Sequence, residues 1–340
     1  MISKKLMGLA AALSLAALAA TAPAKAQSVA DFYRGKTVTV LIGYGAGGTD
    51  DIWARLISRY MSRYIPGEPT VIASNMPGAG SLLVTNQIYN TQPKDGTVIG
   101  LINRGVPFEP LLGGTGTRFD AQKLNYIGSP DVDTPVCAVR MDAPVQKMEE
   151  LMTKELILGA TGSGADSQSY PDVLSKLLGV KMKIVQGYPG SRDILLAMER
   201  NEVQGVCVSY DTVVRSNIFR EKRAKILFQA ALERDDRIPD VPMIQELAKT
   251  DEQKQALQLF LQRTLMGRPF VMGPNVPADR LEAIRKAFEL ALKDPGFAAD
   301  ARGADVNIHY VSPDRLLKVV ADAYATPASS VEAVKKALGR

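Results

Sequence analysis

The sequence contains a single histidine, His309, and two cysteines, Cys137 and Cys207, among 340 residues. Nucleophilic hydrolases pair a serine or cysteine with a base, yet His309 lies in a late polar stretch without an evident partner. The G-x-S-x-G elbow is also absent, because Gly162-Ser163-Gly164 lacks its spacing. No cluster of Cys, His and carboxylate residues has the spacing of metal ligands. We therefore expect no enzyme, catalytic residue, metal or cofactor, and an exported hydrolase is the less favoured alternative.

Long apolar runs are confined to the start of the chain. Lys4 and Lys5 precede an apolar run over residues 6–22, and Ala24-Lys25-Ala26 has the small-x-small pattern of a signal peptidase site. The run is slightly shorter than the roughly 20 residues of a spanning helix, although a retained anchor is the alternative. We expect residues 1–26 to be a signal peptide cleaved after Ala26, and the mature protein to be periplasmic.

The charge excludes another class of partner. The net charge is +5, and the expected signal peptide carries Lys4, Lys5 and Lys25 but no acid, so the mature chain has 5 − 3 = +2. Lys and Arg are also spread along the chain, which argues against a nucleic-acid partner. The mature length exceeds what one compact core usually serves, so two domains are expected. We expect a monomer.

A glycine-rich stretch from Thr37 to Arg55 organises the first half of the chain. It has a short apolar strand, a turn containing Gly43, Gly45, Gly47 and Gly48, and then a helix beginning near Asp50 or Asp51. Glycines allow a ligand to approach the main chain at a helix N-terminus, where the natural guest is an anion. A Walker A loop is excluded because no Gly-Lys-Ser/Thr follows, and a G-x-G-x-x-G match here is weak evidence for a dinucleotide. A tight turn without a ligand is the alternative.

Strands and helices alternate along the rest of the chain, and most expected strands run into glycine or hydroxyl residues. This pattern predicts α/β lobes with parallel sheets, whose ligands bind at the carboxyl ends of the strands. We expect lobe 1 over 27–130, lobe 2 over 131–225, and a return to lobe 1 with C-terminal helices over 226–340. The expected strands are 38–42, 70–73, 98–102, 136–139, 156–160, 183–186, 204–209, 226–230 and 270–272.

Both cysteines lie in apolar runs that we expect to be buried strands. A disulfide forms in an oxidising compartment if those strands are neighbours, and two separate buried thiols are the alternative. A catalytic thiol is not expected.

Six short motifs follow one another in an order that resembles a known family, and together they span nearly the whole mature chain. They are Phe32-Tyr33-Arg34-Gly35-Lys36, the loop from Gly47 to Arg55, Asn75-Met76-Pro77-Gly78-Ala79-Gly80, Lys94-Asp95-Gly96, Tyr188-Pro189-Gly190-Ser191 and Pro239-Asp240-Val241-Pro242. The chain resembles the Bug (TctC-like) extracytoplasmic solute-binding proteins of tripartite tricarboxylate transporters.

The resemblance implies a type II-like periplasmic binding protein with a ligand cleft between two lobes. Such a protein closes on a small carboxylate and delivers it to the membrane permease subunits of a tripartite transporter. A sensor that presents its closed form to a receptor kinase would use the same site. The residues that the resemblance places at the ligand are Tyr44, Gly45, Ala46, Gly47, Gly48, Asp51, Gly78, Ala79, Thr161, Gly162, Ser163, Gly164, Tyr188 and Ser191, to which we add Ser209 and Asp211.

Two charged residues modify that expectation. Asp166-Ser167-Gln168-Ser169 stands where the family often has a histidine, and a carboxylate there would repel a second carboxylate of the ligand. Arg104, after the strand at 98–102, is a candidate for gripping a ligand carboxylate through two hydrogen bonds. A solvated surface arginine is the alternative for Arg104.

Overall fold

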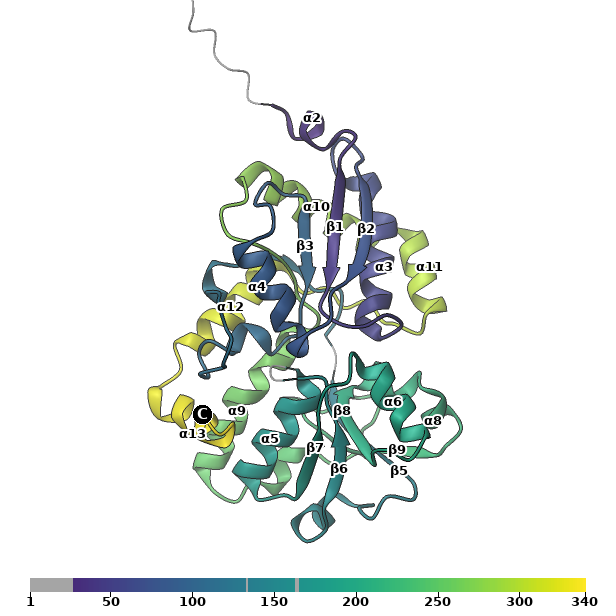
Figure 1. Ribbon diagram of the computed structural model, residues 1–340, viewed down its shortest axis with the longest axis vertical. Coiled ribbons are helices and arrows are strands. Elements are labelled where there is room, and N and C mark those ends of the chain that lie inside the picture. Colours follow the sequence, from purple (N-terminus) through teal and green to yellow (C-terminus); the bar gives the residue numbers. More distant parts are fainter. Residues whose placement is uncertain (1–26, 133, 163–164) are drawn as a thin grey trace, which may run out of the picture.

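The computed structural model describes residues 27–132, 134–162 and 165–340. The expected signal peptide and its cleavage site, together with Ser163 and Gly164, lie outside these ranges. The chain forms two lobes, each built on a five-stranded sheet flanked by helices (Figure 1). The expected two-lobed α/β architecture is confirmed. Within the described part of the chain, no helix is both long enough and apolar enough to cross a membrane.

The first sheet has the strand order β2-β1-β3-β10-β4. β1 pairs in parallel with β2 and β3, whereas β10 is inserted antiparallel between β3 and β4. β1 and β3 are rich in Val and Ile, which favour the extended backbone, and they are mostly buried, whereas the edge strand β2 is partly exposed. The elements of this lobe are α2 (Val29–Tyr33), β1 (Thr37–Ile42), α3 (Thr49–Met61), β2 (Thr70–Asn75), α4 (Leu82–Asn90), β3 (Val98–Leu101), β4 (Asn125–Gly128), β10 (Phe270–Met272), α10 (Ala278–Lys293), α11 (Pro295–Gly303) and α12 (Pro313–Tyr324).

The second sheet repeats this plan with the order β7-β6-β8-β5-β9. β6 is parallel to β7 and β8, while β5 is antiparallel to β8 and β9. The carboxyl ends of the parallel strands lead into helices, so several helix N-termini face the other lobe. The elements are β5 (Pro135–Arg140), β6 (Leu156–Gly159), α5 (Asp166–Leu178), β7 (Met182–Val185), α6 (Ser191–Glu199), β8 (Gly205–Ser209), α7 (Tyr210–Val214), α8 (Asn217–Arg220), β9 (Ala224–Gln229), α9 (Asp251–Leu261) and α13 (Ala328–Ala337).

The return of the chain to lobe 1 comes later than residue 226. β9 pairs with β5, so the expected boundary at 225 falls inside a strand of the second sheet. The last helix, α13, packs against α5 and α9 beside the second lobe (Figure 1). The reason is that an antiparallel edge strand and a C-terminal helix are placed by tertiary packing, which a local pattern does not encode. The return itself is made by β10.

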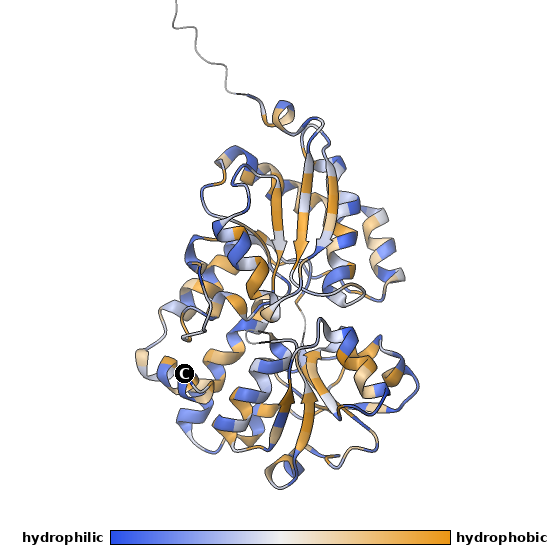
Figure 2. Cartoon of the chain, viewed as in Figure 1, coloured by the Kyte–Doolittle hydropathy of each residue, from blue (hydrophilic) through white to orange (hydrophobic). Residues whose placement is uncertain are grey.

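Apolar residues gather in the strands and on the inner faces of the helices (Figure 2). One core fills lobe 1 around the fully buried Trp53, which stacks on Phe297 with ring centroids 6.2 Å apart. A larger core runs continuously from β1 and α4 through α12, α9 and α13 to α5 and β6. The two lobes are therefore joined by packed side chains along one side, as well as by the crossing segments.

Cys137 and Cys207 form a disulfide. They lie directly opposite each other in the antiparallel β5 and β8 pair, and both are buried. The alternative of two separate buried thiols is therefore wrong for this fold.

Candidate functional site

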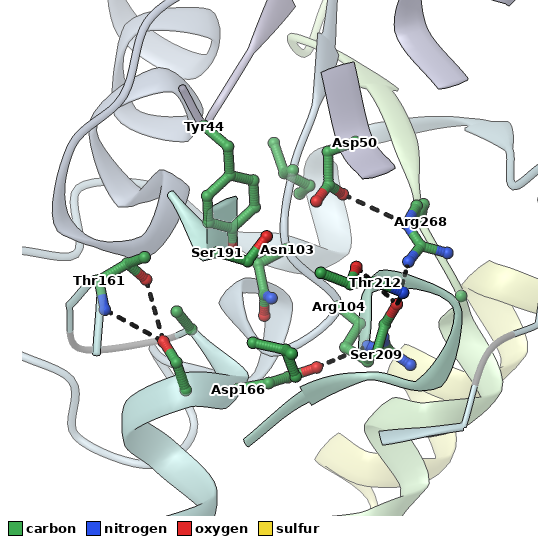
Figure 3. A pocket seen from close by; sticks show the side chains of 15 residues that line it. Tyr44, Asp50, Asn103, Arg104, Thr161, Asp166, Ser191, Ser209, Thr212 and Arg268 are labelled. Carbon is green, nitrogen blue, oxygen red and sulfur yellow. Dashed lines mark hydrogen bonds and ion pairs between the residues drawn. The ribbon is translucent and has the colours of Figure 1, made fainter. Parts of the chain in front are cut away.

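A small cavity of about 50 Å³ lies between the lobes, at the carboxyl ends of strands from both sheets (Figure 3). Lobe 1 contributes the segments after β1 and β3, and the residues just before β10. Lobe 2 contributes the segments after β6 and β8 and the start of α6. The lining residues are Tyr44, Asp50, Ile102, Asn103, Arg104, Thr161, Ala165, Asp166, Ser167, Ser191, Val208, Ser209, Thr212, Gly267 and Arg268.

Three long helices begin at this cavity. Asp50 belongs to the first turn of α3, Asp166 and Ser167 to that of α5, and Ser191 is the first residue of α6. The residues that precede these helices are Gly48, Ala165 and Gly190, and none of them caps its helix with a side-chain hydrogen bond. Helix N-termini carry partial positive charge and N–H donors, so their convergence suits an anion.

The first glycine loop owes its shape to Asp51. The buried Asp51 carboxylate accepts hydrogen bonds from the Gly47 N–H (2.9 Å), from Asn75 Nδ2 (2.9 Å) and from Arg55 Nε (3.0 Å). Burial opposes ionisation of Asp51, but the donors from Arg55, Gly47 and Asn75 outweigh it and lower its pKa. Gly47 has a φ of +83°, a left-handed conformation that glycine adopts without strain. Asp51 is thus not the helix cap but folds the loop back over the helix start.

The second glycine turn places the loop that carries Arg104. Ala79 and Ser81 hold positive φ angles of 46° and 73°, which are strained for residues other than glycine. The Ser81 hydroxyl accepts the Asn103 N–H at 2.7 Å. Across the lobes, a Cβ at Gly162 would stand 2.9 Å from the Ala79 Cα, so the backbones pass closely here. This strained turn therefore fixes both Asn103 and the approach of the lobes.

The charged side chains of the cavity are paired, and one pair joins the two lobes. Arg104 Nε lies 3.0 Å from Asp166 Oδ2, and both side chains are buried, with 4% and 7% of their surface exposed. Arg268 binds Asp131, lies 3.5 Å from Asp50 Oδ1 and donates to the Ser209 hydroxyl at 2.7 Å. The alternative of a solvated surface arginine is wrong for Arg104, which lines the cavity.

Polar groups complete the contact between the lobes. The hydroxyls of Thr49 and Thr212 are 2.5 Å apart, and Arg215 donates to Thr49. The Gly45 N–H donates to the Pro189 carbonyl at 3.3 Å. The lobes are thus held in a closed arrangement.

Burial raises the pKa of Tyr44 well above its usual range, and Asp50 and Asp166 raise it further, so its phenol stays protonated.

Residues expected at the ligand fall into three groups. Tyr44, Arg104, Thr161, Ser191 and Ser209 line the cavity. Tyr44 and Thr161 also face a more open neighbouring hollow of about 350 Å³, which is lined as well by Gly78, Ala79 and Tyr188.

The remaining expected residues lie further from the cavity. Gly47 and Gly48 border a hollow on the other side of Ser191. Gly45 and Gly162 make the backbone approaches between the lobes, and Ala46 is exposed in the same loop as Gly45. Asp211 does not line the cavity, because its carboxylate pairs with Arg237 at 2.8 Å.

Several lining residues were not predicted from the sequence as ligand contacts. Asn103 precedes Arg104 and follows an expected strand, so its position after β3 was a usable signal. Asp50 and Thr212 lie in the first turns of helices, which was a weaker signal for a ligand contact. No feature of the sequence near Arg268 indicated a ligand contact, because only the insertion of β10 between β3 and β4 brings this residue to the site.

Metal binding has no support in the part of the chain that the structure describes. No group of three or more His, Cys, Asp and Glu side chains is close enough there to hold a metal ion.

The fold and the interlobe cavity define the class of two-lobed solute-binding proteins. The profile of the tripartite tricarboxylate transporter family receptor matches residues 54–335. The chain belongs to this family, whose members are extracytoplasmic receptors and not enzymes. The resemblance found in the sequence motifs is therefore confirmed.

Curated proteins are similar to this chain over most of its length. A UPF0065 protein of Cupriavidus necator is 26% identical over 322 residues, covering 93% of this chain and 91% of its own. A UPF0065 protein of Agrobacterium vitis is 25% identical over 279 residues, covering 78% and 74%.

Solved structures share the fold at lower identity. The periplasmic binding protein BugD superposes with a TM-score of 0.70 at 22% identity, covering 90% of this chain and 98% of its own. MatC of Rhodopseudomonas palustris, solved with bound malate, has a TM-score of 0.70 at 20% identity, covering 88% and 99%. An adipate-bound protein of R. palustris has a TM-score of 0.69 at 16% identity, covering 89% and 97%.

Proposed function

We propose that this protein is a periplasmic receptor that captures a small organic acid between its lobes and delivers it to the membrane permease subunits of a tripartite transporter. In this proposal the chain is exported by a signal peptide cleaved after Ala26 and acts as a monomer. Family membership supports the transporter partner. The malate and adipate complexes of similar structures support a carboxylate as the ligand class.

One observation carries the proposal: three helix N-termini, from both lobes, converge on one cavity without side-chain caps. A carboxylate there receives N–H donors from α3 on one side and from α5 and α6 on the other. Such a ligand interacts with both lobes only when they are closed. It therefore shifts the hinge equilibrium toward the closed arrangement.

Cavity size sets the scale of the ligand. About 50 Å³ is well below the roughly 300–1,000 Å³ of sites for drug-sized molecules. The proposed solute therefore has few non-hydrogen atoms and bears its polar groups close together.

The test is a thermal-shift screen of the chain from Gln27 onward against small carboxylates, amides and neutral compounds. A ligand at 100 times its Kd stabilises the native state by about 2.7 kcal/mol. At roughly 2 °C per kcal/mol for a chain of this size, a true ligand raises Tm by about 5 °C. A carboxylate class that shifts Tm while neutral analogues do not supports the proposal.

A matched pair of glycine variants ties the shift to the cavity. The Gly48 Cβ position lies 3.4 Å from the Ser191 hydroxyl, so the methyl groups of Gly48→Val crowd the start of α6. Gly303 has open space around its Cβ position, so Gly303→Val is the control. We expect the ligand-induced shift to vanish in Gly48→Val and to persist in Gly303→Val. Normal binding by Gly48→Val would remove the glycine loop from the site.

A further inference from the structure

We propose that Arg340 and Glu109 form a latch between the lobes, away from the cavity, which favours the closed arrangement and positions the segment that carries Arg104. This inference rests on the proposed function, because it names positioning residues that control capture by lobe closure without touching the solute.

The latch joins a helix packed on lobe 2 to a loop of lobe 1. α13 packs against α5 and α9, and Arg340 lies just beyond the end of α13. Arg340 Nη2 lies 2.7 Å from Glu109 Oε2, and Arg340 Nη1 donates to the Leu112 carbonyl at 3.2 Å. None of these three residues lines the cavity. Rotation of one lobe against the other therefore changes these contacts independently of any ligand.

Burial makes this pair stronger than another ion pair between the lobes. The Glu109 side chain is 1% exposed and the Arg340 side chain is 16% exposed. Arg220 of lobe 2 also pairs with Asp305 of lobe 1, but these side chains are 56% and 63% exposed. Exposed ion pairs stabilise little, whereas loss of one partner from a buried pair leaves a charge without compensation. We therefore expect the latch to contribute more to closure than the exposed pair.

The lobe 1 end of the latch belongs to the segment that carries Arg104. Glu109 follows Arg104 by five positions. Backbone hydrogen bonds hold residues 105–112 in a compact series of turns. Tyr324 of α12 donates to the Pro107 carbonyl at 3.2 Å, which fixes the segment on lobe 1. The position of Glu109 relative to lobe 2 therefore affects the position of Arg104 in the cavity.

A buried arginine lies between the latch and the cavity. The guanidinium of Arg263 is 4.0 Å from the ring centroid of Phe260 on α9 and 5.5 Å from that of Phe108 in lobe 1. Burial lowers the pKa of Arg263, whereas the carboxylates of Glu109 and Asp166 raise it. The same guanidinium thus interacts with a carboxylate of the latch and with one of the cavity. We expect the latch and the interlobe contacts at the cavity to form together when the lobes close.

The population of closed molecules is measured without any ligand. Spin labels are attached to Ile72→Cys in β2 and to Arg200→Cys next to α6, both exposed, in the chain from Gln27 onward. Figure 1 shows β2 and α6 on the side of the molecule opposite α13. Double electron–electron resonance then gives the ratio of closed to open molecules. We expect a measurable closed population with the latch intact, and a ratio lower by about 5-fold or more in Arg340→Ala.

Three further variants separate the ion pair from other effects of substitution. Arg340→Lys keeps the charge and is expected to restore part of the closed population. Lys336→Ala removes an equal charge from an exposed position on α13 and is expected to leave the ratio unchanged. Glu109→Gln is expected to match Arg340→Ala, and the double variant is expected to lose no more than either single variant. Melting curves establish that each variant is folded, and if Glu109→Gln does not fold, the Arg340 variants still decide the question.

Dissociation kinetics connect the latch to capture. The probes are acetate, succinate and citrate, which carry one, two and three carboxylates. For the probe that binds the wild type most tightly, Arg340→Ala is expected to weaken the affinity by about 5-fold or more. The loss is expected mainly as faster dissociation, because the probe associates with open lobes and the latch acts only after they close.

The outcomes distinguish the latch from the proposed function. An unchanged ratio in Arg340→Ala, an equal loss in Lys336→Ala, or a chain with an intact latch but no closed population refutes the latch. If the ratio falls while the affinity for the probe is unchanged, the latch does not control capture, and that part of the inference is refuted. If no probe binds while the label distances respond as expected, capture of a carboxylate fails and the latch stands.

Discussion

The disulfide between Cys137 and Cys207 is expected to be the largest single covalent contribution to the stability of this protein. It closes a loop with a sequence separation of 70 residues. In the chain-entropy description, a loop of that length lowers the entropy of the unfolded chain enough to stabilise the fold by about 4 kcal/mol at 25 °C. At roughly 2 °C or more per kcal/mol, loss of the cross-link lowers Tm by about 10 °C.

Single and double variants distinguish the cross-link from packing. Cys207→Ala alone removes the bond and is expected to lose nearly the whole 4 kcal/mol or so of loop-closure stabilisation. Adding Cys137→Ala truncates only one further buried sulfur atom, so the double variant is expected to melt close to the single one. The assay is thermal and guanidinium unfolding monitored by circular dichroism.

The refuting result is a set of small, additive losses. If each single variant lost less than about 1 kcal/mol and the double variant lost their sum, the two thiols would be independent, as for sites without shared partners. Ligand affinity well below Tm is expected to change little, because the bond joins β5 to β8 inside the second sheet and not at the cavity.

Three other perturbations have defined outcomes. Gly47→Ala places an alanine at a φ of +83° and is expected to lower the free energy of unfolding by about 1–2 kcal/mol. Gly48→Ala, at a φ of −80°, is expected to change it by no more than about 0.5 kcal/mol. Equal Tm values for the two variants would contradict this expectation. Asp51→Ala removes the acceptor of the Gly47 N–H and is expected to cost about 2 kcal/mol and to weaken binding in calorimetry; if Tm and affinity are unchanged, Asp51 does not shape the loop. Burial opposes ionisation of Asp235, but bonds from Arg237 outweigh it and lower the pKa to about 2, so its stabilising effect is present above pH 4 and is lost as the pH falls from about 4 to 2. In Asp235→Asn, stability is therefore expected to fall less between about pH 4 and 2 than in the wild type. If the stability of both proteins falls identically over this range, Asp235 does not contribute in this way.

Much of the site was predictable because its parts are local. Strand, glycine turn and helix follow one another within about 20 residues, and the physical demands of a tight turn are visible in residue type. The family resemblance, which rests on such local motifs, placed Tyr44, Thr161 and Ser191 at the ligand, and each lines the cavity. The resemblance also indicated Asp166 as a charge in the cleft, because it stands where the family often has a histidine, and Asp166 lines the cavity at the start of α5.

Other residues were placed by contacts that no local pattern encodes. Ser209 is the last residue of β8 and lines the cavity, and Asp211 follows it by two positions. Asp211 does not line the cavity, because its carboxylate pairs with Arg237, which lies 26 residues later in the chain. The sequence was also compatible with a solvated surface position for Arg104. The structure instead pairs it with Asp166 of the opposite lobe, at 3.0 Å. Partner choice of this kind depends on which side chains the fold brings together.

The sequence by itself determined the alternation of strands and helices, the glycine turns at strand ends and the family, because each is written in short periods and motifs. Only the tertiary structure decided the register that joins Cys137 to Cys207, the insertion of β10 that carries Arg268 to the cavity, and the place of β9 in the second sheet. These features depend on pairing between segments that lie far apart in the chain. Such pairing is chosen by the packing of the whole molecule, and residue types near each segment leave it open.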